Sequence, residues 1–156
     1  MRLRVASIGQ RMPPWVEAGW NEYARRMPRE LSLELHEIAA QRRGHNADLA
    51  SIKRNEGKAL LAAVPEGYRI VALDGGGQAW STEQLSLRLQ AWMAQGQHCA
   101  LLIGGPEGLD DACLSAAGER WSLGPLTLPH PLVRVVLAEQ LYRAWTLLSN
   151  HPYHRG

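Results

Sequence analysis

The chain has 156 residues, of which 46% are hydrophobic and 21% charged, and its net charge is +2. The length suits one domain spanning residues 1–156, and the composition is that of a globular protein, which excludes a disordered chain. No run approaches the roughly 18 apolar residues needed to span a bilayer and the N-terminus lacks the apolar stretch of a signal peptide, so we expect a cytoplasmic protein with no membrane partner.

Strand-like and helix-like patterns alternate along the chain. Short apolar or alternating runs predict strands, and apolar residues at helical spacing after a proline or a polar cap predict helices. In chain order the predicted elements are a strand at Leu3–Ile8, a helix at Pro14–Arg26, a strand at Leu31–Ile38, a helix from a cap at Asn46 to about Ala63, a strand at Tyr68–Leu73, a helix at 82–94 capped by Ser81, a strand at Ala100–Ile103, a helix at Leu109–Ala117, a strand at Trp121–Leu123 and a helix at Leu132–Leu148. This order predicts an α/β fold with a parallel, doubly wound sheet.

Only two cysteines occur, Cys99 and Cys113, and both lie in apolar surroundings. Free cysteines are among the most buried residue types, and disulfides are rare in the cytosol. We therefore expect both cysteines to be reduced core residues rather than a disulfide.

The charge is unevenly distributed although the net charge is small. Residues 1–60 carry 11 Lys or Arg against 7 Asp or Glu, whereas residues 61–156 carry 6 against 8. A basic cluster of this kind can follow nucleic-acid phosphates, but from charge alone an ordinary solvated helix face is the favoured interpretation. The basic residues concerned are Arg25, Arg26, Arg29, Arg42, Arg43, Lys53, Arg54 and Lys58.

Three loops rich in glycine or proline occupy residues 73–77, 103–108 and 123–129. Each follows a predicted strand, and ligands of open parallel sheets bind beyond the carboxyl ends of the strands. Trp80 stands where a dinucleotide-binding motif needs its last glycine, and no P-loop motif occurs. The loops therefore fit a ligand read by backbone groups, such as the adenine-containing cofactor S-adenosylmethionine (SAM), or simply three tight turns.

Four segments together resemble the RlmH-type rRNA methyltransferases of the SPOUT superfamily. The run Leu101–Leu109 (LLIGGPEGL) is similar to their second motif, and Leu126–Arg134 (LTLPHPLVR), followed by Glu139–Ala144 (EQLYRA), is similar to their third. The ending Asn150–Arg155 (NHPYHR) resembles their C-terminal tail, and Arg42–Asp48 (RRGHNAD) an N-terminal segment. The resemblance covers essentially the whole chain.

This resemblance implies a fold, a reaction and partners. It implies a trefoil knot near the C-terminus, and a SAM-dependent enzyme that methylates N3 of a pseudouridine in 23S (large-subunit) rRNA, on the assembled ribosome. It also implies that the knot loops form the SAM pocket, with the Gly75–Gly77 run as wall rather than contact. The cofactor-binding residues implied are Leu73, Gly104, Gly105, Leu123, Gly124, Pro125, Leu126, Thr127 and Leu128.

The last predicted helix is apolar on most of its surface, apart from Glu139 and Arg143, which can form an i,i+4 ion pair. A helix of this kind is either fully buried or shared with a partner, and a chain of this size rarely encloses a helix near its C-terminus completely. We expect a homodimer interface, which the resemblance also implies. The apolar residues are Leu132, Val133, Val135, Val136, Leu137, Leu141, Ala144, Trp145, Leu147 and Leu148.

Methyl transfer to a ring nitrogen requires removal of its proton or stabilisation of the ring anion. The candidates for this role are His130, Arg143, His154 and Arg155. His130 lies between two prolines beside the third loop, where it could instead be a helix-entry residue with a satisfied ring.

Contact with RNA is expected from Arg42, Arg43, Tyr142 and Tyr153, because guanidinium groups bind phosphates and tyrosine rings stack on bases. Arg134 and Tyr142 could line the catalytic site or only support it. The tail could also be an unimportant, frayed end. We expect no metal, because the tail histidines have no cysteine or carboxylate close in sequence.

Three other functions stay open at this point. A non-catalytic RNA-binding or ribosome-assembly protein with the same fold would bind no SAM. A flavodoxin-like module would need a phosphate-binding loop after the first strand, where residues 9–13 (Gly-Gln-Arg-Met-Pro) offer little. A methyltransferase acting on tRNA differs only in its substrate.

Overall fold

A five-stranded parallel sheet forms the centre of the computed structural model, which describes residues 1–155. The strands are β1 (Arg2–Ile8), β2 (Ser32–Ile38), β3 (Arg69–Ala79), β4 (Cys99–Ile103) and β5 (Glu119–Ser122). They lie in the order β2-β1-β4-β3-β5, and every neighbouring pair is parallel. The central strand β4 is buried throughout, as its unbroken apolar run requires. The predicted α/β fold with a parallel sheet is confirmed.

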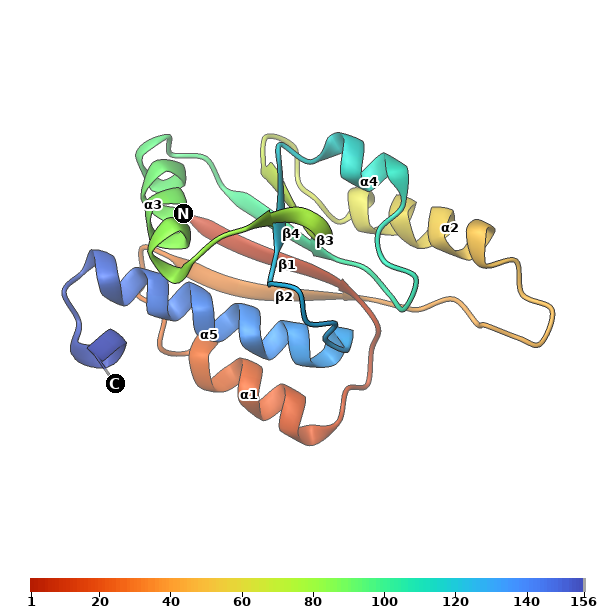
Figure 1. Cartoon of the computed structure of the whole chain (residues 1–156), viewed down its shortest axis with the longest axis horizontal. Coiled ribbons are helices and arrows are strands. Elements are labelled where there is room, and N and C mark those ends of the chain that lie inside the picture. The colour runs from red at the N-terminus through yellow and green to blue at the C-terminus, as the bar shows by residue number, and fades with distance from the viewer. Residues whose placement is uncertain (156) are drawn as a thin grey trace.

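Helices cover both faces of this sheet (Figure 1). One face carries α1 (Pro14–Ala24), α3 (Thr82–Ala94) and α5 (His130–Leu148), and the other carries α2 (Leu49–Ala62) and α4 (Asp111–Ala116). A short 3-10 helix, η1 (Pro152–Arg155), follows α5. In Figure 1 the C-terminal tail lies at the opposite end of α5 from the loop that enters this helix.

The predicted caps are correct for α3 and wrong for α2. Ser81 accepts a hydrogen bond from the backbone of Gln84, whose side chain bonds back to Ser81 in a full capping box. The cap of α2 is Asp48 rather than Asn46, because the chain first makes a turn at 44–47 and Asp48 then accepts from the backbone N–H of Ser51 at 3.2 Å. Asn and Asp are equally good N-cap residues, and the turn before the helix places Asp48 in that position.

Strand β3 continues six residues beyond its predicted end at Leu73, through the glycine run that was expected to be a loop. Trp121 of β5 pairs with Leu73 before the glycines and again with Gln78 after them. A Cβ on Gly77 would lie 2.6 Å from the carbonyl carbon of Arg120, so the two backbones pass too closely for any side chain. The glycines therefore serve a close chain crossing.

Other element ends differ by a few residues from the prediction. Helix α5 begins at His130 rather than Leu132, because a proline is well accommodated in the first helical turn. Helix α4 is shorter than predicted because Asp110 caps it, accepting from the backbone of Cys113 at 3.1 Å. Strand β5 begins two residues early, at Glu119.

Cys99 and Cys113 are both free and buried, which confirms the prediction of reduced core cysteines. Burial raises the pKa of both thiols, that of Cys113 to about 12, so neither is a reactive thiolate near neutral pH. Among residues 1–155, no helix has the length and apolarity that a membrane span requires.

Candidate active site

A cavity of about 860 Å³ opens where the carboxyl ends of β4 and β5 meet the middle of β3. Its walls come from the loops after β4 and β5, from residues 73–75 within β3 and from the start of α5, at the edge of a parallel sheet where ligands ordinarily bind. All nine residues expected to bind the cofactor line it: Leu73, Gly104, Gly105, Leu123, Gly124, Pro125, Leu126, Thr127 and Leu128. The loops thus converge on one site although they are far apart in sequence.

The 104–108 loop is a tight turn that depends on glycine. A Cβ on Gly104 would lie 2.5 Å from the carbonyl carbon of Gly108, and Gly108 has a φ of +81°. The backbone N–H of Gly108 donates to the carbonyl of Gly105 at 2.9 Å. The loop therefore presents backbone rather than side chains to the cavity, which suits recognition of a flat heterocycle.

The backbone path of the 123–129 loop is set by one glycine and two prolines. Gly124 has a φ of +119°, a conformation that favours glycine. Pro125 and Pro129 stiffen the path on either side of Leu126, whose side chain is 78% exposed. A large apolar side chain left exposed at the rim of a cavity is available to cover an apolar part of a ligand.

His130 is the candidate catalytic residue that lines the cavity. It lies in the first turn of α5, and its Nδ1 is buried with no hydrogen-bond partner among residues 1–155. Burial, followed by the positive charges of Arg134 and Arg43, lowers the pKa of this imidazole. The ring is therefore neutral near pH 7 and can accept a proton.

Arg134 is buried behind the site and does not line the cavity. Its guanidinium is fully buried and donates to Ser7 Oγ at 3.1 Å, to the carbonyl of Gly9 at 2.8 Å and to Glu37 Oε2 at 2.6 Å. These bonds fasten the first turns of α5 to the ends of β1 and β2. The sequence left the role of Arg134 open between lining and support, and its contacts assign it to support.

The other three candidate catalytic residues lie far from the cavity of the same chain. Arg143 follows His130 by 13 residues on α5, which is about 20 Å along a helix. Its pKa is raised by hydrogen bonds to Glu139, and the predicted ion pair with Glu139 is confirmed at 3.1 Å. His154 and Arg155 are farther on, in η1. One chain therefore does not bring all four candidates together.

The two tyrosines expected to contact RNA, Tyr142 of α5 and Tyr153 of the tail, pack against each other. Their ring centroids are 4.7 Å apart, and the Tyr153 hydroxyl donates to Glu139 Oε2 at 3.2 Å. Burial raises the pKa of Tyr153, which therefore stays a neutral donor. Tyr142 is only 5% exposed, so a base could stack on it only if the tail moved, and its RNA contact stays a prediction that this geometry does not favour.

The neighbouring arginines of the N-terminal segment have different surroundings. Arg42 is exposed and free to contact a phosphate. Arg43 is instead half-buried between Glu56 and Glu107, at 2.8 and 2.7 Å, so a phosphate would have to displace two carboxylates to reach it. The prediction that Arg43 binds RNA does not fit these contacts.

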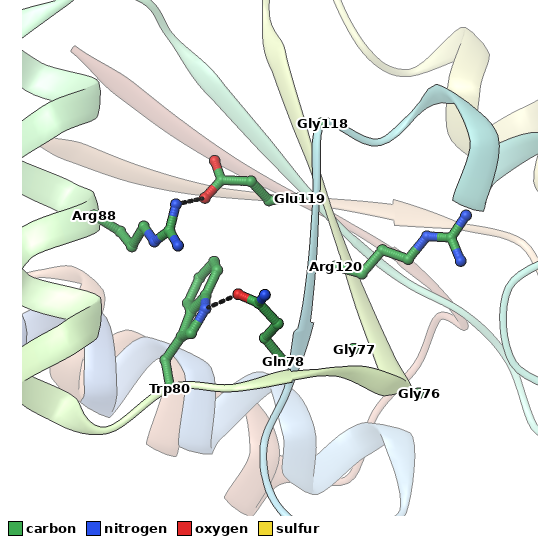
Figure 2. Close-up of a pocket in the computed structure, with 8 residues that line it drawn as sticks. All are labelled: Gly76, Gly77, Gln78, Trp80, Arg88, Gly118, Glu119 and Arg120. Atoms are coloured by element: carbon green, nitrogen blue, oxygen red, sulfur yellow. Dashed lines mark hydrogen bonds and ion pairs between the residues drawn. The ribbon is translucent and has the colours of Figure 1, made fainter.

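A second, more polar hollow of about 450 Å³ lies beside the first, at the outer edge of β5 (Figure 2). Figure 2 shows Glu119 and Arg120 on opposite sides of this strand, with Trp80 and Gln78 beside Glu119. Arg88 stacks over Trp80 at 5.1 Å and pairs with Glu119 at 3.1 Å. Asp74 and Gly75 line the first cavity and Gly76 and Gly77 the second, so the glycine run separates the two.

Sequence reasoning missed some residues of the main cavity. Asp74, Trp121 and Val133 line it in addition to the expected set. The indole Nε1 of Trp121 is buried and has no hydrogen-bond partner within residues 1–155. Its position at the end of a strand next to the third loop was the only available signal. The described part of the chain holds no cluster of three or more His, Cys, Asp or Glu that could bind a metal.

Comparison with known proteins places this chain in a family. The family described as "Predicted SPOUT methyltransferase" matches residues 1–154. Proteins named ribosomal RNA large subunit methyltransferase H from Pseudomonas savastanoi pv. phaseolicola and Azotobacter vinelandii are each 56% identical over 155 residues, which is 99% of this chain and 100% of theirs.

Two solved structures share the fold at low sequence identity. A probable methylase family protein from Haemophilus influenzae has a TM-score of 0.61 at 10% identity, covering 97% of this chain and 69% of that one. A Legionella pneumophila protein solved in complex with SAM has a TM-score of 0.50 at 11% identity, covering 93% and 66%. The chain belongs to the SPOUT methyltransferase family, the family of the ribosomal RNA large subunit methyltransferase H proteins.

Proposed function

We propose that this chain transfers a methyl group from SAM to N3 of a pseudouridine in 23S rRNA, on the assembled ribosome in the cytoplasm. The observation that carries the proposal is the convergence of the nine expected cofactor residues on one cavity, with His130 at its edge. Membership of a family whose relatives carry the name of a large-subunit rRNA methyltransferase supports the substrate. The family match to residues 1–154 supports a single methyltransferase domain.

The residues of the cavity fit SAM. The turn at 104–108 lines the cavity largely with backbone, and at Gly108 no atom lies within 4 Å of where a side chain would begin, so a flat ring could approach the backbone there. Leu126 and the two prolines of its loop would cover the ligand's apolar surface. When bound, SAM supplies an electrophilic methyl group on a sulfonium. The chain's own contribution is to fix the distance and angle of attack and to manage the acceptor's proton.

The acceptor N3 of pseudouridine carries a weakly acidic proton. A neutral His130 at the edge of the cavity can accept this proton as the nitrogen attacks. An arginine beside the ring would stabilise the negative charge that develops on its oxygens. Arg143 and Arg155 are the candidates for this role.

A homodimer would bring these arginines to the site. Leu132, Val136 and Leu147 are only half-buried, and they share the least buried face of α5 with the Glu139–Arg143 ion pair, which leaves a mixed apolar and charged surface for a partner. The tail with Arg155 lies at the far end of the same helix. In a two-fold dimer packed along α5, the tail of one chain would approach the cavity of the other.

The trefoil knot is part of the same proposal. Trp121 pairs with β3 on both sides of the glycine run, and Gly77 crosses the backbone at Arg120 too closely for a side chain. The resemblance of the chain to the SPOUT methyltransferases is what suggests this threading.

For RNA binding, Arg42 and Arg120 are the most accessible candidates near the site. Both are exposed, and Arg120 lies at the polar hollow next to the cofactor cavity. Guanidinium groups in these positions could hold phosphates on either side of the target nucleotide. Tyr153 and His154 of the tail would act from the partner.

The first prediction concerns the cofactor. We expect purified protein to bind one SAM per chain in isothermal titration calorimetry, and the Gly104→Val variant to bind none, because the added side chain collides with the carbonyl of Gly108. Gly67→Val, at an open turn far from the cavity, is the control for a merely strained glycine. Absence of SAM binding by the wild-type protein would contradict the enzyme assignment and favour a non-catalytic RNA-binding protein.

The second prediction concerns pH. The pKa of His130 is lowered below the ordinary value of 6.5, and the neutral ring is the active form, so the methylation rate should fall at acid pH with a midpoint below 6.5. His130→Gln should remove this acid limb and reduce kcat by about 10²–10⁴-fold. An acid limb above pH 6.5, or one retained by His130→Gln, would exclude His130 as the proton acceptor.

A further inference from the structure

Arg43 connects the N-terminal segment to the loop that forms one wall of the cofactor cavity. Its Nε and Nη2 donate to the two oxygens of Glu107 at 3.0 and 2.7 Å. Its Nη1 and Nη2 donate to the two oxygens of Glu56 at 3.0 and 2.8 Å. Glu107 belongs to the 104–108 loop and Glu56 to α2. One guanidinium therefore makes two bidentate carboxylate pairs and joins three segments of the chain.

The α2 end of this connection is rigid. Glu56 is 4% exposed, and its Oε2 also accepts from the backbone N–H of Gln41 at 3.0 Å. Arg43 further donates to the carbonyl of Gln41 at 2.9 Å, so the segment before it is fixed as well. A carboxylate this deeply buried needs a cation, and Arg43 supplies it. The guanidinium is thus anchored on α2 independently of the cavity loop.

The loop end of the connection is adjacent to the cavity without being part of it. Glu107 does not line the cavity, whereas its neighbours Pro106 and Gly108 do. A Cβ on Gly105 would lie 3.0 Å from Nη2 of Arg43 and 3.1 Å from Oε1 of Glu56, so the ion pairs pack directly against the loop backbone. The hydrogen bonds from Arg43 lower the pKa of Glu107, which keeps the link charged at neutral pH.

We propose that Arg43 is a positioning residue, which holds the 104–108 loop against α2 in the shape that binds the methyl donor. The consequence for cofactor affinity rests on the function proposed above, while the effect on the loop itself does not. Arg43 thus acts on the cavity through Glu107, and its exposed neighbour Arg42 is left to meet the RNA.

The test uses Glu107→Gln in the full-length protein, because removing Arg43 would leave Glu56 buried without its cation and could unfold the chain. The variant keeps the size of the side chain and the Arg43–Glu56 pair, but loses the charged link to the loop. In the ligand-free protein we expect the amide proton of Gly108 to exchange about tenfold faster, while strands β1 and β4 exchange as in the wild type. We expect the Kd for SAM to rise about fivefold to tenfold.

Two control variants separate positioning from a general effect. Glu66→Gln removes an exposed carboxylate far from the cavity and should change neither measurement. Arg42→Ala should leave SAM affinity and loop exchange unchanged. Unaltered Gly108 exchange in Glu107→Gln would overturn the proposal even in a protein that binds no SAM. Faster exchange with unchanged SAM affinity would overturn the role in cofactor binding, and a wild-type protein without SAM affinity would refute the proposed function separately.

Discussion

Replacing Arg134 by alanine is expected to lower the free energy of unfolding by about 3–5 kcal/mol, the usual cost of removing one partner from a buried charged network. The side chain is fully buried and donates to Ser7, Glu37 and the carbonyl of Gly9. Without it, these groups lose their donors and α5 loses its fastening to the ends of two strands. Urea unfolding followed by circular dichroism measures the change.

The control for this prediction is Arg120→Ala, which removes an exposed arginine and should change the unfolding free energy by about 0.5 kcal/mol or less. Arg134→Lys should also be strongly destabilised, because an ammonium group cannot reproduce the planar fork of donors. A loss below about 1 kcal/mol for Arg134→Ala would show that the network adds little to stability.

A mixed dimer, in which one chain has a defective cavity and the other a defective tail, is expected to be active although each variant alone is not. His130→Ala and Arg155→Ala should each lower kcat by about 100-fold or more, since one loses the proposed base and the other an anion-stabilising cation. A mixed dimer contains one site built from the intact cavity of one chain and the intact tail of the other. Its activity should therefore be about half that of the wild type.

Co-expression of the two variants with different affinity tags, followed by purification on both, isolates the mixed dimer for the methylation assay. Each parent dimer, purified in the same way, gives the baseline. Mixed dimers as inactive as their parents would mean that the cavity and the tail of one chain act together, which contradicts a site shared between chains. A monomeric protein in solution would contradict it as well.

The fold was largely predictable because its signals are local. Apolar periodicity and caps such as Ser81 depend on residues within a few positions of each other, and all ten predicted strands and helices are present with small shifts at their ends. The extension of β3 was not predictable, because it depends on pairing with Trp121, more than 40 residues later. A glycine run looks the same in sequence whether it forms a loop or a close crossing.

The site was predictable for its backbone and less so for its charged side chains. Glycine and proline loops after strands converge by the geometry of a parallel sheet, which is why eight of the nine cofactor candidates line one cavity, with Leu73 of β3 beside them. The structural roles of Arg43 and Arg134 were harder to predict, because arginines are ordinarily exposed. Only their ion pairs with carboxylates far away in the sequence, Glu107 and Glu37, show that these two are fixed inside the fold. The separation of His130 from Arg143 and the tail also needed the structure.

The most direct test of the proposed function is transfer of labelled methyl from SAM to ribosomes isolated from cells that lack this gene. Intact ribosomes, separated subunits and bulk tRNA are assayed side by side, and the labelled nucleoside is mapped by mass spectrometry. We predict label at N3 of a single pseudouridine in large-subunit rRNA, with intact ribosomes as the preferred substrate. Label confined to tRNA, or no label in any sample from a protein that binds SAM, would contradict the proposed substrate.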